Sequence, residues 1–315
     1  KGTLLGYDAQ NELMVLTGRS QTEEGTNASS LSTLRGSTQK VLFQSTNSYT
    51  EAKVDSQSRD IYFKERDNAQ GKSALYWADS AGTKKVRLTE ESTDRSLPWN
   101  ISDTGILVYV DNQNKIVLGN NFEQVPVYSL PQEYNVKKIM YHAGGNLIFF
   151  LASTSQTSSV LYRLNLDGEK ILSAIDVNVS DFTVSPARSL TAYTKTASTG
   201  KEQLYLYNHV TAMRSYVFSN YIEKLSFSPG GNFIAFATKV TEGMPTQSIW
   251  VMKYNNDIPV QLTANTRLAS DIFWTEDEGG ILFTTADTVA EKAGAEPLYV
   301  TFRLTFDFEY YQDKE

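Results

Sequence analysis

The segment Leu225–Phe236 reads Leu-Ser-Phe-Ser-Pro-Gly-Gly-Asn-Phe-Ile-Ala-Phe. Apolar and polar residues alternate up to Phe227, and Phe233 begins a second apolar run after the Ser-Pro-Gly-Gly-Asn stretch. Alternation of this kind favours a half-buried strand, and an interruption rich in Pro and Gly favours a tight turn. The segment is therefore predicted to form a β-hairpin.

The same hairpin frame recurs along the whole chain of 315 residues. Close copies span residues 182–193 and 139–150, and looser copies span residues 98–109, 54–63, 272–283 and 5–16. The first apolar residues after the turns are spaced by 41 to 48 positions, and they are Leu13, Ile61, Ile106, Leu147, Leu190, Phe233 and Ile281. This period accommodates four short strands with their turns, which is typical of the blades of a β-propeller.

Further strands follow each hairpin. Residues 248–254 and 203–207 read as third strands, and the stretches Arg87-Leu88-Thr89 and Gln261-Leu262-Thr263 end fourth strands. No segment has a helical period longer than a turn or two. We therefore predict an all-β chain that forms one β-propeller domain over residues 1–315, with seven four-stranded blades. The predicted blades are residues 1–47, 48–92, 93–134, 135–178, 179–221, 222–268 and 269–315.

The N-terminal segment leaves a second partition open, in which six blades follow an extension. Residues 1–47 match the repeat least well, and residues 17–30 are polar, but residues 31–34 and 41–44 still read as third and fourth strands. At the other end, residues 302–311 alternate apolar and polar side chains. This alternation predicts an outer strand, and an exposed edge there could add a strand from a partner.

Residues 222–263 resemble the repeat of TolB-like propellers, a WD-type β-propeller repeat family. The resemblance is carried by the Ser-Pro-Gly-Gly-Asn turn, the strand Phe-Ile-Ala-Phe, the strand Ile-Trp-Val-Met and the Leu-Thr ending. The propeller domains of prolyl oligopeptidase and dipeptidyl peptidase IV relatives use a similar repeat. The resemblance implies a propeller fold, and it implies little about activity because propellers carry many functions.

Composition excludes several classes of function. The net charge of −7 and the isoelectric point of about 5.1 argue against a general nucleic-acid surface or a surface for anionic membranes. The sequence has no cysteine, which excludes disulfides, thiolate metal sites and cysteine nucleophiles. Its two histidines, His142 and His209, leave little material for a zinc site or a histidine-dependent triad.

The longest apolar run, residues 147–152, has the length of a strand, so we predict no direct membrane insertion of this chain. The chain begins at Lys1 rather than at a methionine, so we expect a processed or trimmed N-terminus. Together with the TolB-like resemblance, this predicts a periplasmic or extracellular protein, either free or as the soluble domain of an anchored protein.

Ligand sites of propellers commonly lie where the inner strands converge on the channel mouth. The residues predicted to lie there are Glu51, Ser96, Lys138, Asp181, Lys224 and Asp271. A ring of one sign would suggest an ion or a charged ligand. This ring mixes signs, which favours salt bridges or solvated side chains over a dedicated ion site.

The remaining chemical candidates have structural explanations. The acidic turn of residues 275–280 lacks the spacing of an EF-hand loop and is predicted to be an exposed hairpin tip, as is the turn of residues 111–115. His142 is predicted to hydrogen-bond within its blade, and His209 lies in a predicted turn. No G-x-S-x-G elbow and no sialidase box occurs. We predict no catalytic residue, no metal and no cofactor.

These observations favour a non-catalytic propeller scaffold that binds a protein or peptide partner, with the channel mouth as the first candidate surface. Two alternatives stay open. One is a module that binds a glycan or small molecule at the channel mouth, and the other is a hydrolase that uses two carboxylates, for which the 36 acidic residues leave many pairs.

Overall fold

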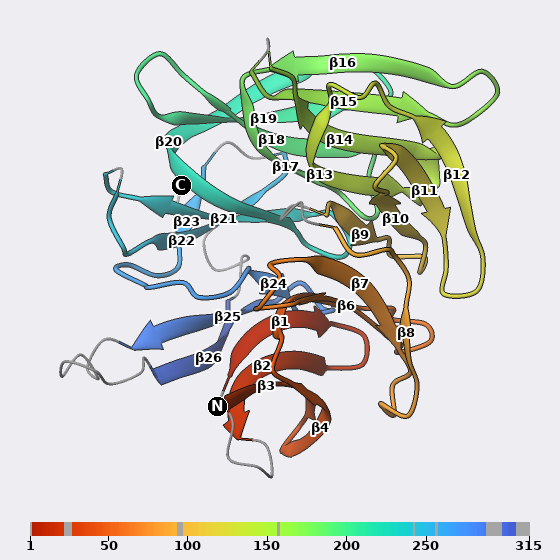
Figure 1. Ribbon diagram of the computed structural model, residues 1–315. Helices are drawn as coiled ribbons and strands as arrows, with labels where there is room; N and C mark the ends of the chain where they lie inside the picture. Colours follow the sequence, from red (N-terminus) through yellow and green to blue (C-terminus); the bar gives the residue numbers. More distant parts are fainter. Residues whose placement is uncertain are drawn as a thin grey trace.

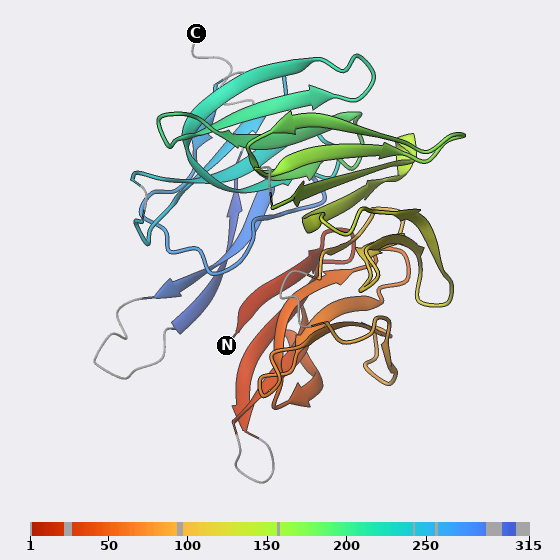
Figure 2. The same cartoon turned by 45° about the horizontal axis from the view of Figure 1, so that its top comes forward.

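The computed structural model describes residues 2–21, 27–92, 97–155, 158–241, 243–255, 258–287 and 298–306. Within these ranges the protein is built of antiparallel strands, and the one helical element is a 3-10 turn at Ala143–Gly145. The sheets follow one another around a common centre, from the N-terminal sheet in red to the C-terminal sheet in blue (Figures 1 and 2). The prediction of an all-β chain is confirmed.

Four sheets each contain four antiparallel strands that are consecutive in sequence. The first sheet is β1 (Thr3–Asp8), β2 (Leu13–Gln21), β3 (Asn27–Arg35) and β4 (Thr38–Ser45). The second is β5 (Ser48–Val54), β6 (Ile61–Arg66), β7 (Ser73–Ala78) and β8 (Lys85–Arg87). The third is β9 (Trp99–Ile101), β10 (Leu107–Val110), β11 (Lys115–Gly119) and β12 (Gln124–Ser129). The fourth is β13 (Asn135–His142), β14 (Leu147–Ser153), β15 (Val160–Asn165) and β16 (Ile171–Val177).

The next sheet, here called the long sheet, has seven strands because β20 belongs to two groups of four. Its strands are β17 (Val179–Val184), β18 (Leu190–Thr196), β19 (Glu202–Asn208), β20 (Arg214–Phe227), β21 (Phe233–Lys239), β22 (Ser248–Lys253) and β23 (Val260–Gln261). The first half of β20 pairs with β19, and the second half pairs with β21. The C-terminal sheet has three described strands, β24 (Phe273–Trp274), β25 (Gly280–Asp287) and β26 (Leu298–Thr305).

The hairpin predicted at residues 225–236 is confirmed as the junction of β20 and β21. Ser228 closes its turn, because its hydroxyl accepts a hydrogen bond from the Phe233 N–H at 3.0 Å and its carbonyl accepts one from Gly231. Gly231 has a φ of +68°, and a Cβ at this position would lie 2.2 Å from the Ser185 hydroxyl of the neighbouring hairpin. Only glycine therefore fits this position without a shift of its neighbours.

The repeated Leu-Thr ending has the same structural role in two places. The Thr89 hydroxyl accepts a hydrogen bond from the Leu75 N–H at 3.0 Å, and the Thr263 hydroxyl accepts one from the Ile249 N–H at 3.1 Å. In each case the threonine satisfies a backbone donor of the third strand after the short fourth strand has ended. A buried donor left without an acceptor costs about 1–3 kcal/mol, which explains the recurring residue type.

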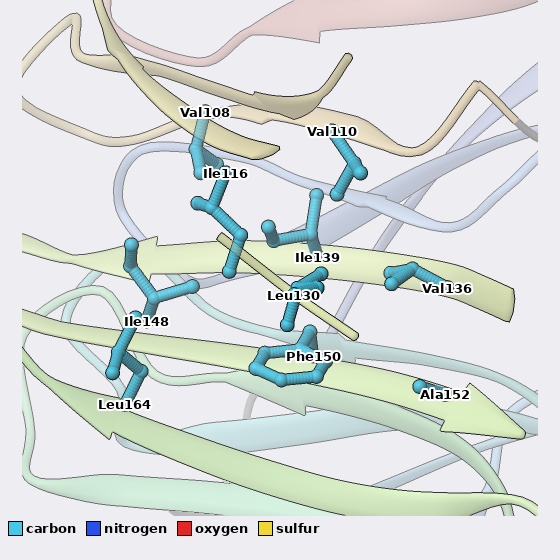
Figure 3. Close-up of a cluster of buried hydrophobic side chains, with 10 residues drawn as sticks. All are labelled: Val108, Val110, Ile116, Leu130, Val136, Ile139, Ile148, Phe150, Ala152 and Leu164. Carbon is cyan, nitrogen blue, oxygen red and sulfur yellow. The ribbon is translucent and has the colours of Figure 1, made fainter. Parts of the chain in front are cut away.

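The hydrophobic core lies between neighbouring sheets. One cluster joins the third and fourth sheets, and Figure 3 shows its ten buried side chains, among them Ile116, Ile139 and Phe150. The aromatic residues at alternating strand positions pack in the same way, for example Trp274, whose ring stacks on Phe233 of the long sheet with centroids 6.0 Å apart. Each such side chain, when buried, contributes about 1.5–3 kcal/mol, so the sheet interfaces supply most of the stabilising free energy.

The first and C-terminal sheets pack against each other without sharing a strand among the described residues. Leu4 and Leu16 form a buried cluster with Leu282, and the Leu4 N–H donates to the Thr284 hydroxyl at 3.1 Å. The hydrogen bond joins residues that are 280 positions apart in the sequence. These contacts bring the two ends of the described structure side by side.

Residues 302–305 of the predicted outer strand belong to β26, which begins earlier, at Leu298, and pairs along its length with β25. Among the described strands, β26 is the outermost of the C-terminal sheet. Residues 307–311 of the same prediction lie outside the described residues. At the N-terminal end, part of the polar stretch 17–30 belongs to β2 and β3, which pair as far as Gln21 and Asn27. Backbone ladder bonds hold this hairpin although its side chains are polar.

Candidate functional site

The predicted ring residues lie on inner strands that share one irregularity. In β1, β5, β13, β17 and β20 the pairing register shifts by one residue near the start of the inner hairpin. Glu51, Lys138 and Asp181 each follow such a bulge directly, and Lys224 is itself the extra residue, with a φ of +56°. Bulges turn side chains away from the regular alternation. The inner strands thus share a bulge at or directly before these ring residues.

The structure brings four of the six predicted residues together as ion pairs between neighbouring inner strands. Lys138 Nζ of β13 lies 2.7 Å from Asp181 Oδ1 of β17. Lys224 Nζ of β20 lies 2.7 Å from Oδ1 of Asp271, which precedes β24. The sequence left open whether the ring residues form salt bridges or stay solvated, and these four form salt bridges. Ser96 lies outside the described residues.

Glu51 pairs with a residue that the sequence did not single out. Its carboxylate accepts from Lys64 of β6, whose side chain is buried, whereas Glu51 itself is half exposed. Lys53, two residues further along β5, donates from Nζ to the Asn100 Oδ1 of β9 at 2.7 Å. Sequence reasoning missed Lys53 and Asn100, although two charges at alternate positions of one predicted inner strand were a usable signal.

The charges of these groups interact across several sheets. Protein surrounds Asp271 on several sides although solvent reaches its carboxylate, and this desolvation alone would raise its pKa. The ammonium groups of Lys224, Lys138 and Lys53 outweigh that effect and lower the pKa of Asp271 below its usual value. These lysines come from the long, fourth and second sheets. The candidate site, here called the inner ring, is therefore Glu51, Lys53, Asn100, Lys138, Asp181, Lys224 and Asp271.

The two histidines meet each other away from the inner ring. His142 closes the turn after β13, where its Nδ1 accepts from the Gly145 N–H at 3.1 Å, as predicted for a bond within its own sheet. His209 Nε2 lies 2.8 Å from the Thr191 hydroxyl, and both imidazoles are buried. Burial and the proximity of His142 lower the pKa of His209 to about 3. A base this weak is poorly suited to proton transfer near neutral pH.

The acidic turn before β25 uses its carboxylates within the protein. Asp277 accepts from the Thr275 hydroxyl at 2.5 Å and from the Gly279 N–H at 3.0 Å. Glu278 accepts from Gly230 N and from Asn232 Nδ2 of the long sheet, both at 2.6 Å. The turn therefore connects two sheets. In the described ranges no group of three or more histidine, aspartate or glutamate side chains is placed to hold a metal ion.

Two surface hollows lie away from the inner ring. A groove of about 600 Å³ runs beside β26 and is lined by Phe283, Val300 and Phe302 together with residues of the long sheet. A hollow of about 500 Å³ lies where the first sheet meets the C-terminal sheet, and it contains the ion pair of Arg303 with Glu12 at 3.2 Å. Neither hollow contains any residue of the inner ring.

Among the described residues, none lies in a helix that has the length and apolar character required to cross a membrane.

Comparison with known proteins identifies the fold. No family model matches the sequence, and no curated protein matches it. Among solved structures, a prolyl endopeptidase matches with a TM-score of 0.66 and 11% identity, over 96% of this chain and 50% of that one. An oligogalacturonate lyase solved in complex with manganese matches with a TM-score of 0.61 and 13% identity, over 97% of this chain and all of that one.

TolB from Acinetobacter baumannii matches with a TM-score of 0.57 and 15% identity, over 92% of this chain and 77% of that one. All three matches are to propeller folds, which confirms the predicted resemblance to TolB-like and prolyl oligopeptidase-type propellers. At these identities the likeness shows the fold alone. The fold is shared by enzymes and by TolB, so activity has to be argued from the site itself.

Proposed function

We propose that this protein is a non-catalytic propeller scaffold that binds a protein or peptide partner at the inner ring. The observation that carries the proposal is the pair of salt bridges Lys138–Asp181 and Lys224–Asp271, which hold partly exposed charges in fixed positions across neighbouring sheets. Fixed, complementary charges of both signs give an interface its specificity and orientation. They suit a polar partner surface better than a single small ion.

The chemistry of the inner ring supports binding rather than catalysis. Three of its carboxylates, those of Glu51, Asp181 and Asp271, each accept from a lysine. A pair of hydrolytic carboxylates needs one group held protonated, which a neighbouring ammonium group opposes. The pKa of Asp271 is lowered, so this group is a poor general acid.

We further propose that the propeller has seven blades and that the protein is periplasmic or extracellular. The two groups of four strands that share β20 would be two blades, and with the four four-stranded sheets and the C-terminal sheet they give seven. This count accounts for the polar hairpin of β2 and β3 as part of a complete first blade. The likeness to TolB supports a periplasmic or extracellular location.

A capture experiment with matched variants tests the binding site. The bait is the wild type, a ring variant with Lys138→Met and Lys224→Met, and a control with Lys84→Met and Lys137→Met. Lys84 and Lys137 are exposed, and the ammonium group of Lys137 donates to the Ser159 hydroxyl at 2.7 Å. A partner is expected to bind the wild type and the control, and to be lost from the ring variant. Capture that is equal on all three baits would contradict the proposal.

A further inference from the structure

The inner strands carry a second set of equivalent positions, deeper than the ion pairs. In five hairpins the turn begins with a residue whose backbone N–H donates to a carbonyl near the start of the following strand, at 2.8 to 3.0 Å. These residues are Asp55, Ser102, Ser185, Ser228 and Thr275. The positions two residues earlier are Lys53, Asn100, Thr183, Ser226 and Phe273. Lys53 is the charged member of this set.

Neighbouring sheets fix the place of the Lys53 side chain. Its Nζ donates to Asn100 Oδ1 at 2.7 Å, and that oxygen also accepts from the Ile101 N–H at 2.8 Å. Asn100 is buried, with 5% of its surface exposed. Gly6 of β1 packs against the backbone of β5, because a Cβ there would lie 2.5 Å from the Ala52 carbonyl oxygen.

Lys53 differs from the other lysines of the inner ring in its partners. Lys138 and Lys224 each have a carboxylate at 2.7 Å. Within the described part of the protein, no carboxylate lies within the 4.0 Å of an ion pair from Lys53 Nζ, whose hydrogen-bond acceptor is the neutral Asn100 amide. An ammonium group has three donors, so it can accept a further partner without giving up Asn100.

The surrounding charge makes an anion favourable at this place. Burial lowers the pKa of Lys53, and the ammonium group of Lys138 lowers it further, against the weaker opposite effects of Asp271 and Glu51. A partly desolvated cation beside a second cation is stabilised by a bound anion, which forms a short, charge-assisted hydrogen bond. Within the described ranges, the Lys53 amino group thus has no carboxylate partner at ion-pair distance, and a bound anion would stabilise its charged form.

We propose that Lys53 binds a carboxylate group that the partner inserts between the inner strands. Asn100 orients the ammonium group, and Lys138 adds positive potential. The inference rests on the proposed function, and it names the chemistry that the partner presents. An acidic side chain and the C-terminus of a polypeptide both supply this carboxylate, and the experiment distinguishes these two sources.

Lysine-selective NMR titration of the full-length protein tests the inference. The probes are N-acetylaspartate α-amide, which has a side-chain carboxylate, N-acetylglycine, which has a terminal carboxylate, and the neutral N-acetylglycinamide. The variants are Lys53→Met, Lys53→Arg and the matched control Lys84→Met, which removes an exposed charge from the same sheet. The Lys53 signals are assigned by their loss in Lys53→Arg, and near-ultraviolet circular dichroism checks that each variant is folded.

The Lys53 signals of the wild type are expected to shift saturably with a carboxylate probe and not with the neutral amide. In the variants, the Lys138 signals report binding of the probe. The affinity for the carboxylate probe is expected to fall by about tenfold or more in Lys53→Met, and by less than about threefold in Lys53→Arg. Whichever carboxylate probe binds more tightly identifies the source. The inference is overturned if neither carboxylate moves the Lys53 signals, or if the amide moves them equally. If the captured partner is still lost from the ring variant in that case, the proposed function stands and only the carboxylate assignment fails.

Discussion

The imidazole rings of His142 and His209 lie edge to face, with their centroids 5.2 Å apart, where the fourth sheet packs against the long sheet. His209 also lies against the ring of Phe149, with centroids 4.6 Å apart. Both histidines have a pKa below the ordinary value, chiefly because burial opposes the charged form. The pair is therefore a neutral element of the sheet interface, and it couples the stability of that interface to pH.

Stability is expected to fall as the pH drops below about 6.5, the ordinary pKa of histidine. The pKa of His209 in the folded protein is about 3, so between these values the unfolded state binds a proton that the folded state does not. His209 alone is expected to lower the free energy of unfolding by about 1.4 kcal/mol per pH unit in this window, and to have no effect above it. Urea unfolding at about pH 7.5 and about pH 5 measures the loss, which His209→Gln should reduce. An unchanged loss in that variant would refute the assignment to His209.

The pKa of Asp271 is expected to depend on Lys138, although the two residues come from different sheets. Lys138→Met is expected to raise the pKa of Asp271 towards its ordinary value, because it removes one of the ammonium groups that lower it. The measurement is a titration of the Asp271 carboxyl carbon by NMR. The control is Lys137→Met, the adjacent lysine of the same strand, whose ammonium group contacts Ser159 instead. Equal effects of the two variants would contradict the interaction between Lys138 and Asp271.

We expect the threonines of the two Leu-Thr endings, Thr89 and Thr263, to contribute equally to the free energy of unfolding. Thr89→Val and Thr263→Val keep the shape of the side chain and remove the hydroxyl acceptor, so each is expected to lower the free energy of unfolding by about 1–2 kcal/mol. Thr104→Val, at an exposed turn where the hydroxyl pairs with the Ser102 hydroxyl, is expected to have an effect below about 0.5 kcal/mol. Denaturant unfolding compares the three. If Thr104→Val lowers the free energy of unfolding as much as the other two variants do, the structural role given to Thr89 and Thr263 is wrong.

Because the hairpins that contain Ser185 and Gly231 approach closely, we expect alanine to destabilise the protein more at Gly231 than at Gly200. Gly231 and Gly200 both have positive φ, at +68° and +78°, so replacement by alanine strains both by a similar amount. At Gly231 the new Cβ would also meet the Ser185 hydroxyl, whereas nothing lies within 4 Å of the Cβ position at Gly200. Gly231→Ala is therefore expected to destabilise the protein by at least about 1 kcal/mol more than Gly200→Ala. Equal thermal unfolding midpoints would contradict the packing of the two hairpins.

The fold was predictable because its signal is local and repeated. Each hairpin has turn residues such as Ser228 and Gly231 that act within a few positions, and seven spaced copies reinforce one another. The bounds of the strands were hardest to predict where this signal is weak. Polar residues 17–21 pair through the backbone, and the alternation after Phe302 does not show whether a strand starts there or continues from Leu298.

The site was predictable only in part, because it depends on contacts between sheets. Counting along the inner strands found Lys138, Asp181, Lys224 and Asp271, whose spacing follows the repeat. The same counting could not pair Glu51 with Lys64 or Lys53 with Asn100, because these contacts depend on how neighbouring strands face each other. Nor could it show that two histidines 67 positions apart in the sequence meet in one interface.

Photocrosslinking from position 137, next to Lys138, tests most directly the central claim that a protein or peptide binds at the inner ring, and it leaves every ring residue in place. A photoreactive side chain replaces Lys137 in one protein and Ile171, an exposed residue at the start of the outer strand β16, in a second. We expect the captured partner to crosslink from position 137 and not from position 171. Crosslinking from position 171 alone would place the partner on the outer edge of the fourth sheet and contradict the claim.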